Sequence, residues 1–139
     1  MADIDHEISI KASVETIYKA LTTLDGLRAW HTVEVEGDAK VNGHLIFKAE
    51  GKPTFDWKIL SLDPHNITWE CVSGPGDSAG TKVIYKISKY DDERSLVEMR
   101  HAGWPGQHGN FRKCNTLWGI LLHHLKTYAE TKSALPAIK

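Results

Sequence analysis

His101 is the polar side chain in this sequence that is best placed to take part in chemistry. It lies in the alternating segment 95–102, where its phase puts it on the same inward face as Val97 and Met99. A buried imidazole there could hydrogen-bond a ligand or move a proton near neutral pH. It could equally be a core histidine whose ring is satisfied by a neighbouring carbonyl group. His31, beside Trp30, presents the same two possibilities.

Other common kinds of catalytic or metal site are not indicated. His123 and His124 are adjacent and would point about 100° apart on a helix, whereas two ligands of one metal ion need a step of three or four residues. No serine lies in a Gly-x-Ser-x-Gly turn, and neither cysteine has a context that favours a thiolate. Gly74-Pro75-Gly76 precedes a strand pattern and indicates a hairpin turn, not a phosphate loop. The sequence therefore predicts no catalytic residue, no metal site and no cofactor.

The tryptophans are a second group of candidate functional residues. The chain has five of them, Trp30, Trp57, Trp69, Trp104 and Trp118. Two fall in the middle of alternating segments and one on an apolar helical stripe, so their rings either line a cavity for an apolar ligand or fill the core. Trp30 and Trp104 flank predicted loops, and we expect them near the mouth of such a cavity.

The elements that position these side chains follow from hydrophobic periodicity. Residues 110–131 predict a long helix, because apolar residues recur at three- and four-residue steps, namely Leu117, Trp118, Leu121, Leu122, Leu125, Tyr128 and Ala129. At about 1.5 Å per residue this helix is roughly 33 Å long, so a broad apolar surface must cover its stripe. We expect the segment after Lys132 to fray.

Seven segments with period-two alternation predict strands. They are residues 4–10, 33–36, 44–50, 54–62, 67–72, 81–89 and 95–102, and turn residues separate most of them at hairpin spacing. Two short helices are predicted between the first two strands, over residues 14–22 after the cap Ser13 and over residues 24–29, where Gly26 weakens the pattern. Together the strands predict an antiparallel meander with one solvated face.

Composition and charge restrict the class of protein. The 139 residues are enough for one domain, residues 1–139, with a single core, and 41% hydrophobic with 25% charged residues is a globular composition. No apolar run reaches the roughly 18 residues of a membrane span. The acidic start, Met1 to Asp5, does not resemble a signal peptide, so we expect a cytoplasmic protein in which Cys71 and Cys114 are packed thiols. The net charge of -1 gives no reason to expect nucleic-acid binding.

Three stretches of the sequence resemble a known family. Residues 10–22 look like its first strand and helix, and residues 27–31 look like its aromatic turn before the second strand. Residues 97–104, together with Trp118, Gly119 and residues 122–125, resemble its C-terminal end. The family is the START-like superfamily, and the chain is most similar to the branch related to the C-terminal domain of the activator of the heat-shock-protein-90 ATPase.

The resemblance implies an α+β helix-grip fold, in which a curved seven-stranded antiparallel sheet wraps round the long C-terminal helix. With the inward aromatic residues, it also implies a cavity between sheet and helix that binds a small hydrophobic or aromatic molecule without catalysis. We expect the binding residues to be Trp30, Phe47, Trp57, Trp69, Tyr85, Met99, His101, Trp104, Trp118 and Leu122.

Two other functions remain open. A co-chaperone-like module would bind a chaperone, an ATPase of the heat-shock-protein-90 type, through the outer face of the sheet, where the alternate strand phase is charged: Asp56, Lys58, Glu70, Lys82, Lys86, Glu98 and Arg100. These charges are explained equally well by cross-strand pairs on a solvated face. An enzyme similar to polyketide cyclases would use His101 or His31 to transfer a proton.

Overall fold

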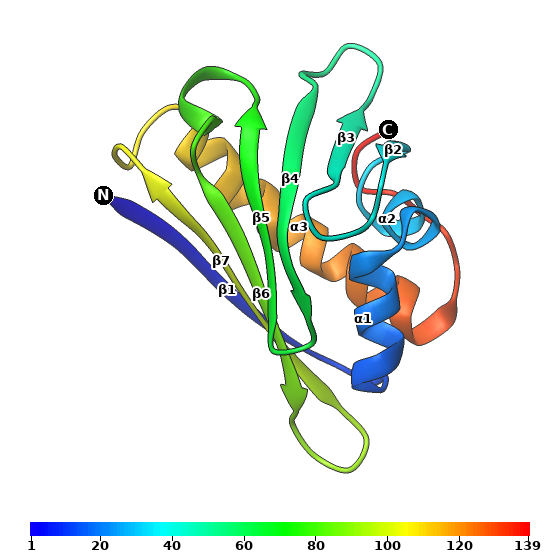
Figure 1. Ribbon diagram of the computed structural model, residues 1–139. Coiled ribbons are helices and arrows are strands. Elements are labelled where there is room, and N and C mark those ends of the chain that lie inside the picture. The colour runs from blue at the N-terminus through cyan, green and yellow to red at the C-terminus, as the bar shows by residue number, and fades with distance from the viewer.

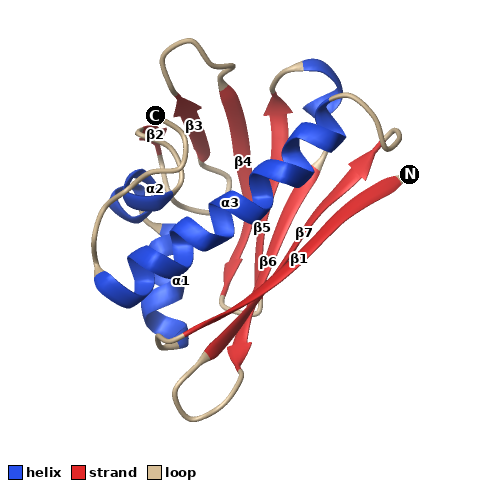
Figure 2. Cartoon of the chain, turned by 180° about the vertical axis from the view of Figure 1, so that it is seen from behind, coloured by secondary structure: helices blue, strands red, loops and turns tan.

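The computed structural model describes residues Met1 to Lys139 and has the expected α+β helix-grip architecture (Figure 1). In chain order the elements are β1 (Ala2–Ile10), α1 (Val14–Thr22), α2 (Leu24–Trp30), β2 (Glu34–Gly37), β3 (His44–Lys48), β4 (Phe55–Asp63), β5 (Asn66–Ser73), the 3-10 turn η1 (Gly76–Ser78), β6 (Lys82–Lys89), β7 (Ser95–Trp104) and α3 (Asn110–Thr131). Helix α3 crosses one face of the curved sheet (Figure 2). The predicted order of elements is confirmed.

All seven strands form one antiparallel sheet. Its order is β1-β7-β6-β5-β4-β3-β2, so β2 to β7 make a meander and β1 joins its far edge. In this last pairing Ile10 lies opposite Ser95, and Ala2 lies opposite Trp104. Most strands begin or end one or two residues away from the predicted limits, and β7 runs on to Trp104.

Side-chain caps and one close backbone contact fix the two short helices. Ser13 Oγ accepts the N–H of Thr16 at 3.1 Å, and Thr23 Oγ1 accepts the N–H of Gly26 at 3.0 Å. A Cβ on Gly26 would lie 2.8 Å from the backbone of Ala20. The glycine that weakens the helical pattern in the sequence is therefore the residue that lets α2 pack directly on α1.

The sheet separates an apolar inner face from a charged outer face. A single cluster of 27 buried hydrophobic residues fills the space between the sheet and the helices. On the outer face Lys58 lies opposite Glu70 and Lys86 opposite Glu98, and Arg100 forms an ion pair with Asp5 at 2.7 Å. The predicted alternation of core and solvated faces is confirmed.

The prediction that the segment after Lys132 frays is wrong. The N–H groups of Leu135, Ala137 and Ile138 donate to the carbonyls of Ala29, Trp30 and His31 at 2.8 to 3.0 Å, and Val33 N–H donates to Ile138. His124 Nδ1 also lies 2.6 Å from the Leu135 carbonyl. Because these bonds satisfy the last carbonyls of α2, residues 135–138 form a closing strap that is fixed to α2 and to the segment between α2 and β2.

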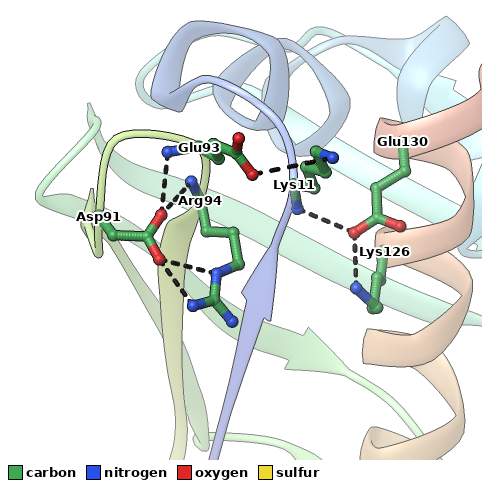
Figure 3. Close-up of polar contacts among 6 residues, drawn as sticks. All are labelled: Lys11, Asp91, Glu93, Arg94, Lys126 and Glu130. Carbon is green, nitrogen blue, oxygen red and sulfur yellow. Dashed lines mark hydrogen bonds and ion pairs between the residues drawn. The ribbon is translucent and has the colours of Figure 1, made fainter.

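Charged groups join the β6–β7 turn and the end of β1 to α3. Asp91 and Arg94 pair within the turn between β6 and β7, where their closest contact is 2.6 Å. Lys11 donates its backbone N–H to Glu130 of α3 at 2.8 Å, and its ammonium group pairs with Glu93 (Figure 3). Lys126 also pairs with Glu130, so this carboxylate ties the end of β1 to the last turns of α3.

Candidate functional site

A cavity of about 290 Å³ lies between the concave face of the sheet and α3. It is bounded by the end of α2, strands β3 to β5 and β7, the first half of α3 and the closing strap. We call it the aromatic cavity. Its lining residues are His31, Thr32, Phe47, Ala49, Lys52, Pro53, Phe55, Trp57, Trp69, Pro75, His101, Asn110, Lys113, Cys114, Leu117, Trp118, Ala137 and Ile138.

Five of the ten residues expected to bind a ligand line the aromatic cavity: Phe47, Trp57, Trp69, His101 and Trp118. The rings from the sheet are in mutual contact, with Trp69 5.8 Å from Phe47 and 6.2 Å from Trp57 between ring centroids. The alternation of these strands brings their aromatic residues to one face, opposite the apolar stripe of α3.

The other five residues expected to bind a ligand do not line the cavity: Trp30, Tyr85, Met99, Trp104 and Leu122. All are at most 2% exposed and belong to the core. Trp30 and Trp104 were expected near the cavity mouth, yet both are fully buried. Trp30 donates its indole N–H to the Ala20 carbonyl at 2.8 Å, and Trp104 packs edge-on against Phe111. They are buried because α2 folds back on α1 and because β7 continues through Trp104.

The rim of the cavity comes mostly from residues that the sequence analysis did not select. Lys52 and Pro53 belong to the loop between β3 and β4, Lys113 to the first turn of α3, and Ala137 and Ile138 to the closing strap. Only long-range packing brings these segments together, so no local pattern marks them. Phe55 was detectable, because it shares the inward phase of Trp57 and stacks on it with ring centroids 5.8 Å apart.

The imidazole of His101 lies in the middle of a directional chain of hydrogen bonds. Trp118 donates its indole N–H to Nδ1 of His101 at 3.0 Å. Nε2 of His101 lies 2.8 Å from Thr81 Oγ1, and this hydroxyl donates its own proton to the Ser78 carbonyl at 2.6 Å. Thr81 must therefore accept from His101, so the imidazole is the neutral tautomer with its proton on Nε2.

Both nitrogens of His101 are thus occupied by partners inside the protein. Burial lowers the pKa of His101 from 6.5 to about 4, since a charged ring would lack solvent. A proton on Nδ1 would also displace the Trp118 bond. The geometry favours a positioning role for His101, which fixes the Trp118 ring in the cavity wall, over the proton-transfer role that a cyclase-like enzyme would require.

His31 is the second histidine in the wall, and one of its nitrogens is free. Nδ1 lies 2.7 Å from Thr32 Oγ1, whereas Nε2 makes no hydrogen bond within the protein. The ring meets Phe47 edge-on at 4.5 Å and Trp118 at 6.1 Å between centroids. Burial lowers its pKa to about 3, so His31 is neutral and can offer one polar atom to a ligand.

Trp69 adds a second polar group without a partner. Its indole nitrogen is buried and makes no hydrogen bond, as is also true of the Trp104 nitrogen and the Tyr85 hydroxyl. Buried donors in proteins almost always have a partner. Of these three residues only Trp69 lines the aromatic cavity, so a ligand acceptor there could satisfy it.

The two cysteines are protonated thiols. Burial is the main cause that raises the pKa of both Cys71 and Cys114 to about 11, and the nearby carboxylate of Asp77 contributes for Cys114. Cys114 lines the cavity, but a thiol with such a pKa carries almost no thiolate at neutral pH. The prediction of packed thiols agrees with this environment.

The fold and its aromatic cavity define a START-like protein of the helix-grip class. Residues 11–130 match the family described as Activator of Hsp90 ATPase homolog 1-like protein. The match covers most of the chain, and the chain therefore belongs to this family. No curated protein matches the sequence at a significant level.

Several solved structures are similar to the chain. One is the Aha1 dimer from Colwellia psychrerythraea, determined in solution, with 32% identity, a TM-score of 0.83 and coverage of 94% of this chain and 98% of that one. CalU16 from Micromonospora echinospora has 21% identity and a TM-score of 0.73, over 91% of this chain and 73% of that one. DynU16, from the dynemicin biosynthetic locus, has 16% identity and a TM-score of 0.80, over 95% and 48%. The last two show the fold alone.

None of the helices combines the length and the hydropathy that crossing a bilayer requires. The cytoplasmic location, the lack of nucleic-acid binding and the lack of a metal or cofactor stay predictions. The binding of a small molecule in the cavity, the binding of a chaperone and a cyclase-like activity that would use His101 or His31 likewise stay predictions.

Proposed function

We propose that the protein binds a small hydrophobic or aromatic molecule in the aromatic cavity. The single observation that supports this most is a space of about 290 Å³ lined by Phe47, Phe55 and three of the five tryptophans. An apolar cavity of about 150 Å³ admits one benzene ring, so this space suits a molecule of about two rings. Ligand sites in proteins are commonly apolar, with a few polar groups that fix orientation.

The chain's own residues supply both parts of such a site. The rings of Trp57, Trp69 and Trp118 can pack against an aromatic ligand in stacked or edge-to-face arrangements. Nε2 of His31 and the indole N–H of Trp69, neither of which has a partner in the protein, would orient its polar atoms. Both ring nitrogens of His101 already have hydrogen-bond partners, Trp118 and Thr81. This arrangement supports binding of a ligand without catalysis.

An NMR titration with the neutral bicyclic probe 2-naphthylmethanol tests the proposal. We expect the indole N–H signals of Trp57 and Trp69 to shift, because their rings line the cavity. The indole of Trp30 is bonded to Ala20 away from the cavity, so its signal should stay in place. If the three signals shift equally or not at all, the cavity is not the binding site.

A cavity-filling substitution gives an independent prediction. Ala49→Trp places an indole at the rim and should weaken binding of 2-naphthylmethanol by at least about tenfold in calorimetry, since the ligand and the new ring compete for one space. Ala79→Trp is the matched control, because Ala79 is exposed and does not line the cavity. Equal affinity for both variants would contradict the proposed site.

A co-chaperone role is the second candidate, and the family match together with the 32% identical Aha1 structure favours it. In this case the charged outer face of the sheet would bind an ATPase of the Hsp90 type. Saturating protein should then raise the ATPase rate of the chaperone, Lys82→Glu with Lys86→Glu should reduce the effect, and Ala49→Trp should leave it unchanged. No change in rate at saturation would remove this candidate.

A further inference from the structure

The charged residues that line the aromatic cavity are all positive. Two lysines, Lys52 and Lys113, are part of it, and no aspartate or glutamate is. Neither lysine forms an ion pair within the protein, as is also true of other exposed lysines such as Lys82 and Lys86. The two histidines in the wall are neutral because burial lowers their pKa values to about 3 and about 4. At neutral pH the lining therefore carries two positive charges and no negative one.

The two lysines reach the cavity from separate elements. Lys52 lies on the loop between β3 and β4, and Lys113 lies in the first turn of α3. Both are exposed, so their ammonium groups remain hydrated at the rim while the interior is aromatic. An anionic group at the opening could pair with these charges without entering the apolar part.

The N-terminal end of α3 adds to the positive electrostatic potential at the rim of the cavity. The helix has 22 residues, its N-cap Gly109 makes no side-chain bond, and its first turn contains no acidic residue. The partial positive charge at this end is therefore not compensated by the helix itself. Asn110 and Lys113, both in that turn, line the cavity. Asp77 is near enough to Cys114 to raise its pKa, but it is not part of the lining.

We infer that the ligand of this site is an amphipathic aromatic acid. Its body of about two rings lies against Trp57, Trp69 and Trp118, and its carboxylate stays at the rim between Lys52 and Lys113. The inference rests on the proposed function and adds the charge of the ligand to it. A cation is disfavoured by the same two lysines, and a neutral molecule leaves them without a partner.

Three matched probes test the inference by calorimetry: 2-naphthylacetate, 2-naphthylacetamide and the cation 2-(2-naphthyl)ethylammonium. The carboxylate should bind about tenfold more tightly than the amide, because an exposed ion pair contributes up to about fivefold and two lysines are present. The cation should bind most weakly. About 0.5 M salt should remove most of the difference between carboxylate and amide, since exposed charges are then screened.

Substitution of the two lysines separates their effect from that of the cavity. Lys52→Gln with Lys113→Gln should weaken carboxylate binding by about tenfold and leave amide binding unchanged. Lys82→Gln with Lys86→Gln, on the outer face, is the matched control and should change neither. If carboxylate and amide bind equally and the lysine variants have no effect, the inference is overturned while the proposed function stands. If no probe binds, or if Ala49→Trp leaves binding intact, the proposed function itself fails.

Discussion

We expect the free energy of unfolding to fall by roughly 2 to 2.5 kcal/mol per pH unit as the pH decreases from about 6 to 4.5. Burial lowers the folded-state pKa of His31 to about 3 and that of His101 to about 4, from an ordinary value of 6.5. In this window the unfolded chain binds protons that the folded chain excludes, so stability is complete above pH 6.5 and is lost on acidification. Each histidine contributes at most about 1.4 kcal/mol per pH unit, and less at the two ends of the window, where the unfolded ring is only partly protonated or folded His101 begins to bind a proton. Urea unfolding at successive pH values measures the slope.

The variant His101→Gln measures how much His101 contributes to the pH dependence of the free energy of unfolding. A glutamine side chain can accept from Trp118 through its carbonyl and donate to Thr81 through its amide, so the chain of hydrogen bonds is kept and the titration is removed. The slope should fall to about half. His65→Gln, which replaces an exposed histidine in the turn between β4 and β5, is the matched control variant. The same slope in both variants would show that His101 is not excluded from protonation.

The two carboxylates with a lowered pKa, Glu130 and Asp91, contribute little to the loss of stability above pH 4.5. The pKa of Glu130 is lowered, mainly by its hydrogen bond with Lys126 and then by the backbone N–H of Lys11. Its contribution is therefore present above its ordinary pKa of 4.5 and is lost only below that value. The contact between Asp91 and Arg94 likewise lowers the pKa of Asp91 from 3.8. The window between pH 6 and 4.5 thus reports on the two buried histidines.

The second large effect is expected at Gly26. Gly26→Ala should destabilise the protein by about 1–2 kcal/mol, because its Cβ would lie 2.8 Å from backbone atoms of Ala20 and Lys19, which cannot rotate away as a side chain could. The gain of about 1 kcal/mol that alanine brings to a helix offsets part of the cost. Urea or thermal unfolding measures the change.

Gly119 is a matched control for this substitution. It lies within α3, and a Cβ built on it meets no atom within 4 Å. Gly119→Ala should therefore stabilise the protein by about 0.5–1 kcal/mol, through helix propensity alone. The two glycine-to-alanine changes are expected to have opposite signs, and destabilisation by both would refute the argument from packing.

Periodicity predicted the fold because each long element carries its own pattern. Helix α3 has the limits that the apolar stripe indicates, from Asn110 to Thr131. The packing of α2 on α1 and the order of the C-terminal segment depend instead on tertiary contacts. Gly26, which lowers helix propensity, is required where α2 meets α1. The closing strap has no local pattern, and its order depends on the carbonyls of Ala29, Trp30 and His31, about 100 residues away in the sequence.

The candidate site was predicted less completely than the fold. Alternation identifies the inward face of a strand, but it does not separate residues at a cavity from residues deeper in the core. Trp69 and Tyr85 share the inner face in adjacent strands with ring centroids 5.4 Å apart, yet only Trp69 lines the cavity. For His101 the sequence pattern is compatible with a carbonyl partner, whereas its partners in the structure are the Thr81 hydroxyl and the Trp118 indole.

The position of β1 at the edge beside β7 has a consequence for the order of folding. Strands β2 to β7 pair with their neighbours in the chain, so each hairpin closes a short loop. The pairing of Ile10 with Ser95 and of Ala2 with Trp104 closes a loop of most of the chain, at a much larger cost in entropy. Strand β1, which precedes the meander in the chain, is thus expected to dock late, after the meander offers it an edge. Until then Ile4 and Ile10, which are buried in the native core, remain exposed and prone to association.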